Sequence, residues 1–377
     1  MNEDKASRYN RLKRQVRVGS VGASAALLLL LVLSGMSHLL RDLAEWAASW
    51  LPGSLQGFVT VTAFIALLTL VNELVSLPFA FYGGFVLERR YGLSRQSLSH
   101  WLADQGKGLA LGAGLGIPAA WILYAFIGRY PSGWWLPAGV VFAGLMIGLA
   151  NIAPLLLLPM FYSIKPLSRS SLRDRLVALG ERAGARVLDA YEWGLGEKTT
   201  KANAALTGIG SSRRILVSDT MLAQYSDDEI EVVLAHELGH HVHGDIWKGI
   251  AFETVLILAG FYVAAVGLRM AVPFAGLRAV DDLAGLPVLL LAAGAVSLAA
   301  VPVTHALSRA HERRADRFAL TLTRNPPAFI SAMRRLAQQN MAEDEPSTLV
   351  RWLFYSHPPI RERIAAAQAF TRSEPRS

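Results

Sequence analysis

The chain has 377 residues, of which 53% are hydrophobic and only 18% are charged, a composition that excludes an ordinary water-soluble domain and indicates a membrane protein. It contains no cysteine, which excludes disulfides, thiolate metal sites and cysteine nucleophiles. The net charge of +8 comes from the N-terminal arm and from short loops between apolar runs, so it indicates membrane topology, and no nucleic-acid partner is expected.

The first apolar run, residues 18–40, follows a basic arm and predicts a membrane helix with a cytoplasmic N-terminus. The alternative is a cleaved signal peptide. The run is long for a signal peptide, and no A-x-A cleavage site closes it. The positive charges of the arm are Lys5, Arg8, Arg11, Lys13, Arg14 and Arg17.

Five further apolar runs bring the expected number of membrane spans to six. Polar residues inside two of them, Asn72 with Glu73 and Glu253, are costly in lipid and should face protein or a wet cavity. An amphipathic segment, residues 41–53, is expected at the membrane interface. An even number of spans places both termini and the polar domain on one side, the cytoplasm by charge. The five runs cover about residues 58–87, 108–128, 134–161, 249–272 and 285–307.

A polar segment separates the fourth and fifth spans. Residues 168–185 predict an amphipathic helix, and residues 186–193 predict a strand. Two more strands are expected at residues 202–207 and 213–218, around the turn GIGSS. The expected fold is mostly α, a polytopic membrane protein with a small α+β domain. Its parts are an N-terminal membrane domain (1–165), a polar domain (166–248), two membrane helices (249–307) and a polar tail (308–377).

The motif H-E-L-G-H at residues 236–240 is the centre of the chain's chemistry. Ser226 and Glu229 form a capping box that starts its helix. On one helix face His236 and His240 can share a zinc ion, and Glu237 can take a proton from a water on that metal. Gly239 costs roughly 1 kcal/mol of helix propensity, and we expect it to leave room beside the metal. Two surface histidines on an ordinary helix are the alternative.

The third ligand is expected directly after the sixth span, in SRAHERRAD. Glu312 is the predicted ligand, and Asp316, one helical turn later, can accept the outer N–H of a ligand histidine. The alternative for this segment is a solvated charged helix, and the alternative ligand is His243.

Metal-assisted hydrolysis of a peptide bond also needs a donor for the developing oxyanion. The stretch YSHPPIRER, residues 355–363, is the expected source, although it could equally be a turn into the last helix.

With these motifs in order, the chain resembles the type I CAAX prenyl endopeptidases, integral-membrane zinc metalloproteases of the gluzincin kind, with HtpX-type proteases as more distant relatives. The resemblance covers the chain from about residue 77 onward. It rests on LPFAFYGGFVLERRYGLSRQSL, KPLSRSSLRDRL, KANAALTGIGSSRRILVSDTML, the metal helix, SRAHERRAD and YSHPPIRERI.

The resemblance implies a ring of membrane helices around a water-filled chamber, with one zinc ion per chain. It implies that His236, His240 and Glu312 are zinc ligands, that Glu237 is the catalytic base and that Asp316 lies behind the ligands. Four further residues have implied roles toward substrate: Asn203 and Ala204 pair with an extended peptide, and His357 and Arg363 contact the carbonyl or the intermediate.

The chain also departs from its eukaryotic relatives, because it lacks their first span, the long loop after that span and an insertion before the metal helix. The compact form resembles prokaryotic members, so a bacterial inner membrane is expected. Since prokaryotes generally do not prenylate CAAX proteins, the expected substrate is a peptide or membrane-protein segment, with lipid modification left open.

Two other functions compete with the protease. A transporter or channel with a structural zinc would use Glu73 and Glu253 as pathway residues, but a structural zinc site is closed by four ligands and leaves Glu237 without a role. A catalytically dead scaffold conflicts with the complete set of ligands and base.

Overall fold

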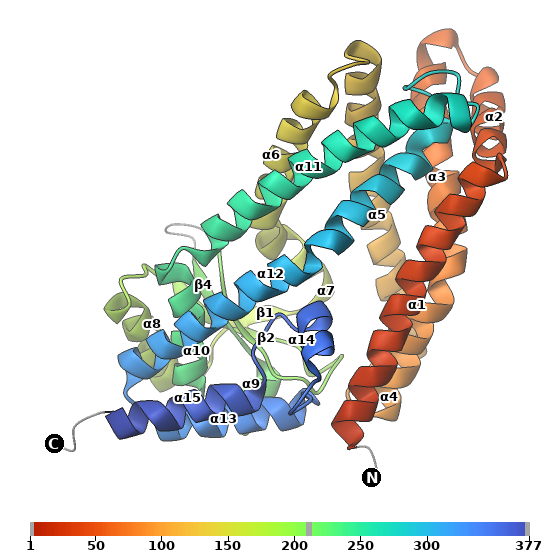
Figure 1. Cartoon of the computed structure of the whole chain (residues 1–377). Coiled ribbons are helices and arrows are strands. Elements are labelled where there is room, and N and C mark those ends of the chain that lie inside the picture. The colour runs from red at the N-terminus through yellow and green to blue at the C-terminus, as the bar shows by residue number, and fades with distance from the viewer. Residues whose placement is uncertain (1–3, 209–212, 374–377) are drawn as a thin grey trace.

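The structure, a computed structural model, describes residues 4–208 and 213–373. Within these ranges six helices are long and apolar enough to cross a membrane, which confirms the predicted mostly α membrane fold. The membrane helices form one long array, and the small sheet lies at one end of it (Figure 1). The spans are α1 (Lys5–Leu33), α3 (Gly53–Ala80), α5 (Leu98–Arg129), α6 (Trp135–Leu156), α11 (Asp245–Phe274) and α12 (Leu286–Thr323).

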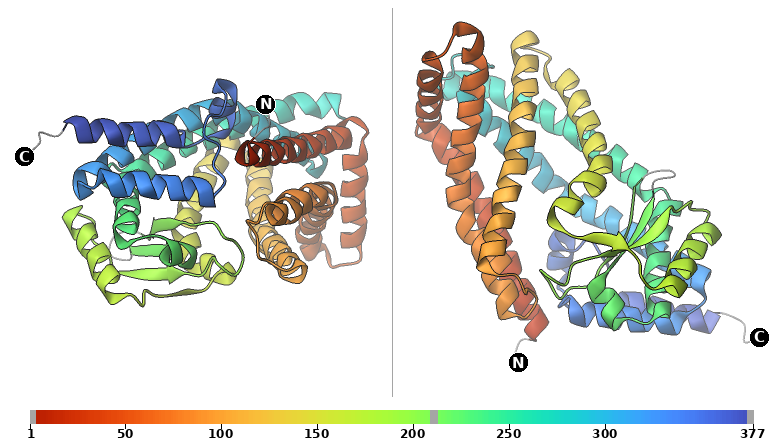
Figure 2. Two further views of the ribbon diagram at one scale, coloured as in Figure 1. Left: turned by 90° about the horizontal axis from the view of Figure 1, so that it is seen from below. Right: turned by 180° about the vertical axis from the view of Figure 1, so that it is seen from behind.

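The six spans close into a ring. Helix α1 packs on α3, α3 on α5, α5 on α6, α6 on α11, α11 on α12, and α12 returns to α1. The α5–α6 pair and the α11–α12 pair each diverge from a short connection at the end far from the sheet (Figure 2). An apolar pocket of about 470 Å³ lies between α5, α6, α11 and α12.

The predicted first span ends too late. Its helix begins at Lys5 and stops at Leu33, because Gly35 adopts a left-handed conformation with φ of 74°. Helix α2 (Met36–Ser49) follows, so the interfacial amphipathic helix is shifted from the predicted residues 41–53. Its buried Arg41 donates to Asp282 at 2.6 Å, which ties α2 to the α11–α12 connection. A short 3₁₀ turn, η3 (Leu283–Gly285), completes that connection.

The second span ends at Arg90, close to its predicted end, but it is not one regular α-helix. After Pro78, which removes a backbone donor from the helix ladder, the chain forms a π-helical turn, η1 (Phe81–Val86), and then α4 (Leu87–Arg90). The buried Glu88 carboxylate accepts from Tyr9 of α1 at 2.6 Å and from Lys201 of the polar domain at 2.9 Å. This end of the ring is therefore fastened to the domain that carries the metal motif.

The polar domain contains a four-stranded sheet with the strand order β1-β2-β4-β3. The three predicted strands are present as β2 (Asp189–Trp193), β3 (Ala204–Thr207) and β4 (Arg214–Ser218). The predicted turn GIGSS falls mostly outside the described residues. Strand β1 (Ile164–Pro166) was missed because three residues show no alternation of apolar and polar side chains. β2 and β4 are parallel, and both outer pairs are antiparallel, which leaves β3 as an edge.

Helices cover the sheet and enclose one apolar core. Helix α10 (Asp227–Val242) starts with the predicted capping box, in which Ser226 and Glu229 each bond the other's backbone N–H. The core includes Leu172, Leu176, Ile215, Leu234 and Phe329. The remaining helices are α7 (Leu158–Phe161), α8 (Ser170–Arg182), α9 (Asp219–Gln224), α13 (Pro326–Gln339), α14 (Thr348–Phe354) and α15 (Ile360–Ser373).

Helix α12 does not end where the sixth span was predicted to end. It runs without a break from the membrane part into the segment that carries Glu312 and Asp316 (Figure 1). The predicted boundary at residue 307 thus falls inside one continuous helix, and the third predicted ligand lies on the same helix as the sixth span.

Candidate active site

Helix α10 presents both motif histidines on one face, as a spacing of four residues requires. The Nε2 atoms of His236 and His240 lie only 3.3 Å apart. The side chain of His236 is 8% exposed and that of His240 24% exposed.

Glu312 approaches the two histidines from α12. Its Oε2 atom lies 3.3 Å from His236 Nε2, and its Oε1 atom lies 3.3 Å from His240 Nε2. Ligand atoms from these three residues fall within 4.8 Å of one another. The structure thus brings together the three residues predicted as metal ligands.

Gly239 permits the close approach of α12 to α10. A Cβ added at Gly239 would lie 2.9 Å from Ala315 Cα and 3.3 Å from Ala315 O, so the glycine admits the backbone of α12. The expectation that it also leaves room beside the metal stays a prediction. Gly239 sets the spacing of the two helices that carry the three ligands.

Each histidine is held from behind by a carboxylate. Asp316 Oδ1 lies 2.8 Å from His236 Nδ1, the contact predicted from sequence, and Asp245 Oδ2 lies 3.1 Å from His240 Nδ1. Because a carboxylate accepts, each Nδ1 donates its proton, and each Nε2 then presents a lone pair toward the other. Arg314 donates to Asp245 at 2.7 Å and orients it.

This donor set fits a metal cation. Two imidazole Nε2 atoms and a carboxylate converge, and the buried Glu312 Oε2 receives no well-directed hydrogen bond from any described residue, although His357 Nδ1 is 2.7 Å away. Burial lowers the pKa of His236, but hydrogen bonds with Asp316 and Glu312 outweigh it and raise that pKa to about 9. A proton held this firmly marks a position that a cation can take over.

Glu237 and His357 lie in a cleft of about 350 Å³ beside the ligands. Burial raises the pKa of the Glu237 carboxyl. The side chain of His357 is 62% exposed, so it is open to a molecule in the cleft. The structure therefore places a carboxyl base and an imidazole around one opening.

Arg363 also lines the cleft, but its guanidinium faces Asp316. It donates from Nε at 2.8 Å and from one terminal nitrogen at 2.5 Å, which makes a buried, bidentate pair. This pair fixes the carboxylate that holds His236. A contact between Arg363 and substrate stays a prediction.

The open strand β3 forms one wall of the cleft, which Asn203 and Ala204 line. Asn203 makes two hydrogen bonds with Ser218 at the end of β4. The backbone N–H of Asn203 donates to the Ser218 hydroxyl at 3.0 Å, and the backbone N–H of Ser218 donates to the Asn203 carbonyl at 2.9 Å. An edge strand beside the ligands offers backbone groups to an extended peptide.

His243, the alternative ligand, lies outside the three-residue group. Its Nδ1 donates to the Gly239 carbonyl at 2.7 Å, and its ring packs edge-on against Phe318.

Sequence reasoning missed residues that hold the site from a distance. Asp245 follows His240 closely, but only the left-handed turn at Gly244 brings it back to the ring. The buried Arg309 of α12 donates to the Tyr355 carbonyl at 2.7 Å and so fixes the segment before His357. For Asp245, the one sequence signal was a carboxylate soon after an H-E-x-x-H helix.

Comparison with known proteins identifies the family. Residues 166–371 match the profile of peptidase family M48. The chain belongs to peptidase family M48. Residues 2–163 match the profile described as CAAX prenyl protease N-terminal, five membrane helices. The predicted resemblance is confirmed, and this M48 peptidase is an integral-membrane metalloprotease.

Relatives of this M48 peptidase include the uncharacterized metalloprotease YhfN of Bacillus subtilis, 30% identical over 367 residues, which cover 96% of the chain and 84% of YhfN. CAAX prenyl protease 1 of Saccharomyces cerevisiae is 30% identical over 202 residues, covering 52% of the chain and 45% of the yeast protein. The crystal structure of S. mikatae Ste24p aligns with a TM-score of 0.83 at 23% identity, over 96% of this chain and 87% of that one, and shows the shared fold.

Proposed function

We propose that this M48 peptidase is a zinc-dependent endopeptidase that cleaves peptides or membrane-protein segments. Its proposed zinc ligands are His236, His240 and Glu312. One observation carries the proposal: His236, His240 and Glu312 bring metal-ligating atoms within 4.8 Å of one another, and His236 and Glu237 line the same open cleft. Two histidines and one carboxylate are the ligands of many hydrolytic zinc sites. Zinc, when bound, supplies a Lewis acid that polarises a carbonyl and lowers the pKa of water.

The protein's own residues supply the proton transfers. Glu237 accepts the proton of the attacking water and delivers it to the leaving amine. Asp316 and Asp245 keep both histidines in the tautomer that presents Nε2, and Arg363 keeps Asp316 in place.

Substrate binding follows from the walls of the cleft. An extended peptide adds to β3 beside Asn203 and Ala204, with its backbone parallel to the sheet plane. The exposed imidazole of His357 donates to the carbonyl oxygen where charge develops. Arg363 contributes its positive charge from beneath. The open cleft favours this function over a structural metal site in a transporter or channel.

The topology proposal follows the charge of the chain. We propose that both termini and the protease domain face the cytoplasm from a bacterial inner membrane, because six spans follow a basic N-terminal arm. The domain limits 1–165, 166–248, 249–307 and 308–377 belong to the same proposal. Membrane lipids surround the ring, and no nucleic-acid partner is proposed.

The test measures cleavage of a CAAX-like peptide, with and without a farnesyl group, by purified protein in detergent. We expect Glu237→Gln to keep zinc, measured by metal analysis, and to lose about 100-fold or more in rate. His236→Ala should lose both zinc and cleavage, and a chelator should abolish cleavage reversibly. Equal cleavage of the two peptides means that the substrate need not be lipid-modified. Unchanged turnover in Glu237→Gln contradicts the proposal.

A further inference from the structure

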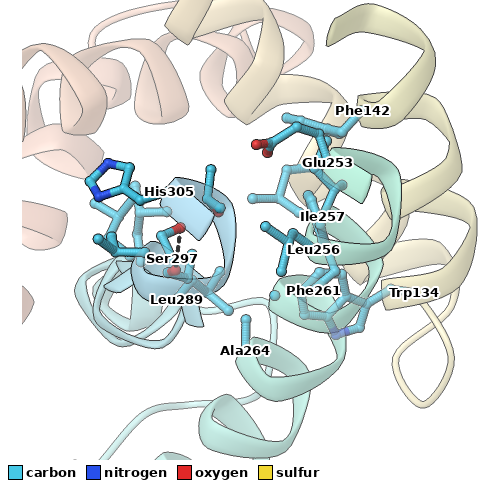
Figure 3. Close-up of a pocket in the computed structure, with 17 residues that line it drawn as sticks. Trp134, Phe142, Glu253, Leu256, Ile257, Phe261, Ala264, Leu289, Ser297 and His305 are labelled. Atoms are coloured by element: carbon cyan, nitrogen blue, oxygen red, sulfur yellow. Dashed lines mark hydrogen bonds between the residues drawn. The ribbon is translucent and has the colours of Figure 1, made fainter. Parts of the chain in front are cut away.

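The pocket inside the ring has a polar end and an apolar end. Glu253 of α11 and His305 of α12 lie at one end, whereas Ala264 and Leu289 line the other (Figure 3). Thr304, the residue before His305, also lines the pocket. Glu253 comes roughly two helical turns, or about 12 Å, after Asp245 in α11, and His305 comes about two turns before Glu312 in α12. The polar end is therefore the end nearer the metal ligands.

Glu253 is the carboxylate among the described residues that line this pocket, and its negative charge has no cation beside it. Its side chain is exposed to the pocket, and no described residue pairs with its carboxylate. The other polar side chains are already bonded: Thr304 donates to the Ala300 carbonyl at 3.1 Å, and His305 Nδ1 to the Trp352 carbonyl at 3.2 Å. A carboxylate without a partner at membrane depth is costly and marks a functional position.

The pocket is linked to the cleft by one short segment. His305, which lines the pocket, bonds the carbonyl of Trp352, and the chain from Trp352 reaches Tyr355 and His357, which line the cleft. Along α11, Asp245 beside His240 comes first, Glu253 follows, and Ala264 at the apolar end comes last. Because the axial rise from Asp245 to Glu253 is about 12 Å and an extended chain advances about 3.3 Å per residue, a peptide that runs alongside α11 from the His240 end covers that rise in roughly four residues.

We propose that this pocket is a specificity subsite for an apolar peptide segment that carries one basic residue, with Glu253 as the counter-charge. The basic residue lies about four positions from the scissile bond, and the apolar residues beyond it fill the end lined by Ala264 and Leu289. Charge complementarity selects a Lys or Arg, and the position of the pocket inside the membrane ring selects apolar neighbours. This inference rests on the proposed function of the metal cleft.

The test measures binding and needs no turnover. Dansyl-labelled peptides with an Ala/Leu segment carry one Lys at successive positions, and a matched series carries norleucine, which keeps the apolar stem and removes the charge. Binding to full-length, zinc-loaded Glu237→Gln protein is followed by fluorescence. Adding Glu253→Gln should weaken the Lys peptide by about 30-fold, the lower range for a desolvated charge pair, and leave the norleucine peptide unchanged.

Glu73 provides a matched control, because it is also a carboxylate inside a predicted span but does not line this pocket. Glu73→Gln should keep the Lys preference. Glu253→Lys should reverse it and favour the same peptide with Glu in place of Lys. In the active protein, kcat/KM should follow the same pattern, with the strongest effect at one spacing from the cleavage site determined by mass spectrometry.

Several results overturn the subsite. The first is a preference for the Lys peptide that is unchanged in Glu253→Gln, and the second is an equal loss of that preference in Glu73→Gln. The third is phosphatidylethanolamine that co-purifies with the wild type but not with Glu253→Gln, while the Lys and norleucine peptides bind with equal affinity. The last result would assign the pocket to an amine-bearing lipid. Selective Lys binding without cleavage by the wild type would refute the proposed peptidase activity but keep the subsite, so the two failures are distinguishable.

Discussion

Replacing Gly239 by alanine tests whether the spacing of α10 and α12 sets the metal site. Alanine improves helix propensity by about 1 kcal/mol. Its Cβ would lie 2.9 Å from Ala315 Cα, where carbon contacts closer than 3.4 Å are already tight, so α12 must move by about 0.5 Å. Overpacking of this kind costs about 1–3 kcal/mol, so the net change in stability is a loss of about 0–2 kcal/mol.

The effect on metal binding should exceed the effect on stability. Ala315 lies one turn after Glu312, so the displaced backbone is that of the third ligand. A shift of about 0.5 Å equals the tolerance of a working site, and we expect zinc affinity to fall by about 10-fold or more. The assay is competition with a chelating dye on purified protein, together with the midpoint of thermal unfolding.

Gly249 of α11 is the matched control, because a Cβ there meets no atom within 4 Å. Gly249→Ala should keep zinc affinity and hold or raise the midpoint. If Gly239→Ala behaves in the same way, α10 and α12 are not in close contact at this residue, and Gly239 does not set their spacing.

Two further predictions concern carboxylates around α10. Asp245→Asn should weaken zinc binding by about 10–100-fold, measured against Asp228→Asn, an exposed acid in the first turn of α10; equal affinities would exclude Asp245 from the site. Burial raises the pKa of Glu229, but hydrogen bonds from Ser331 and Arg335 outweigh it and hold that pKa below its usual 4.5. The folded state therefore gains stability from this carboxylate above about pH 4.5 and loses it as the pH falls through the folded pKa. Glu229→Gln should thus be less stable than the wild type at neutral pH. In acid-unfolding curves it should lose less stability than the wild type between about pH 5 and 3. Parallel curves for the two proteins would contradict the linkage.

Local patterns predicted the parts of the site that lie on single helices. The capping box and the four-residue histidine spacing are encoded within α10, and the one-turn spacing of Glu312 and Asp316 is encoded within α12. These signals need no knowledge of tertiary packing, because helix periodicity alone places the side chains on one face.

Features that depend on packing between elements were missed or misread. Asp245 reaches His240 only because Gly244 reverses the chain, and Gly239 has its role only because α12 crosses there. Strand β1 exists because β2 offers it a partner. The start of the second span at Gly53, ahead of the predicted residue 58, and the break at Gly35 show that apolar composition locates a span but does not fix its ends.

The continuity of α12 also bears on how the protein is made. His236, Glu237 and His240 are synthesised before the last two spans, whereas Glu312 is the end of the sixth span itself. A nascent chain therefore carries the proposed base and two of the three proposed ligands before the third. Glu312 reaches α10 through the packing of α12 against that helix, and α12 also packs on α1 and closes the ring. The proposed ligand set is thus complete only when the sixth span has been made and packed, which couples assembly of the metal site to assembly of the membrane ring.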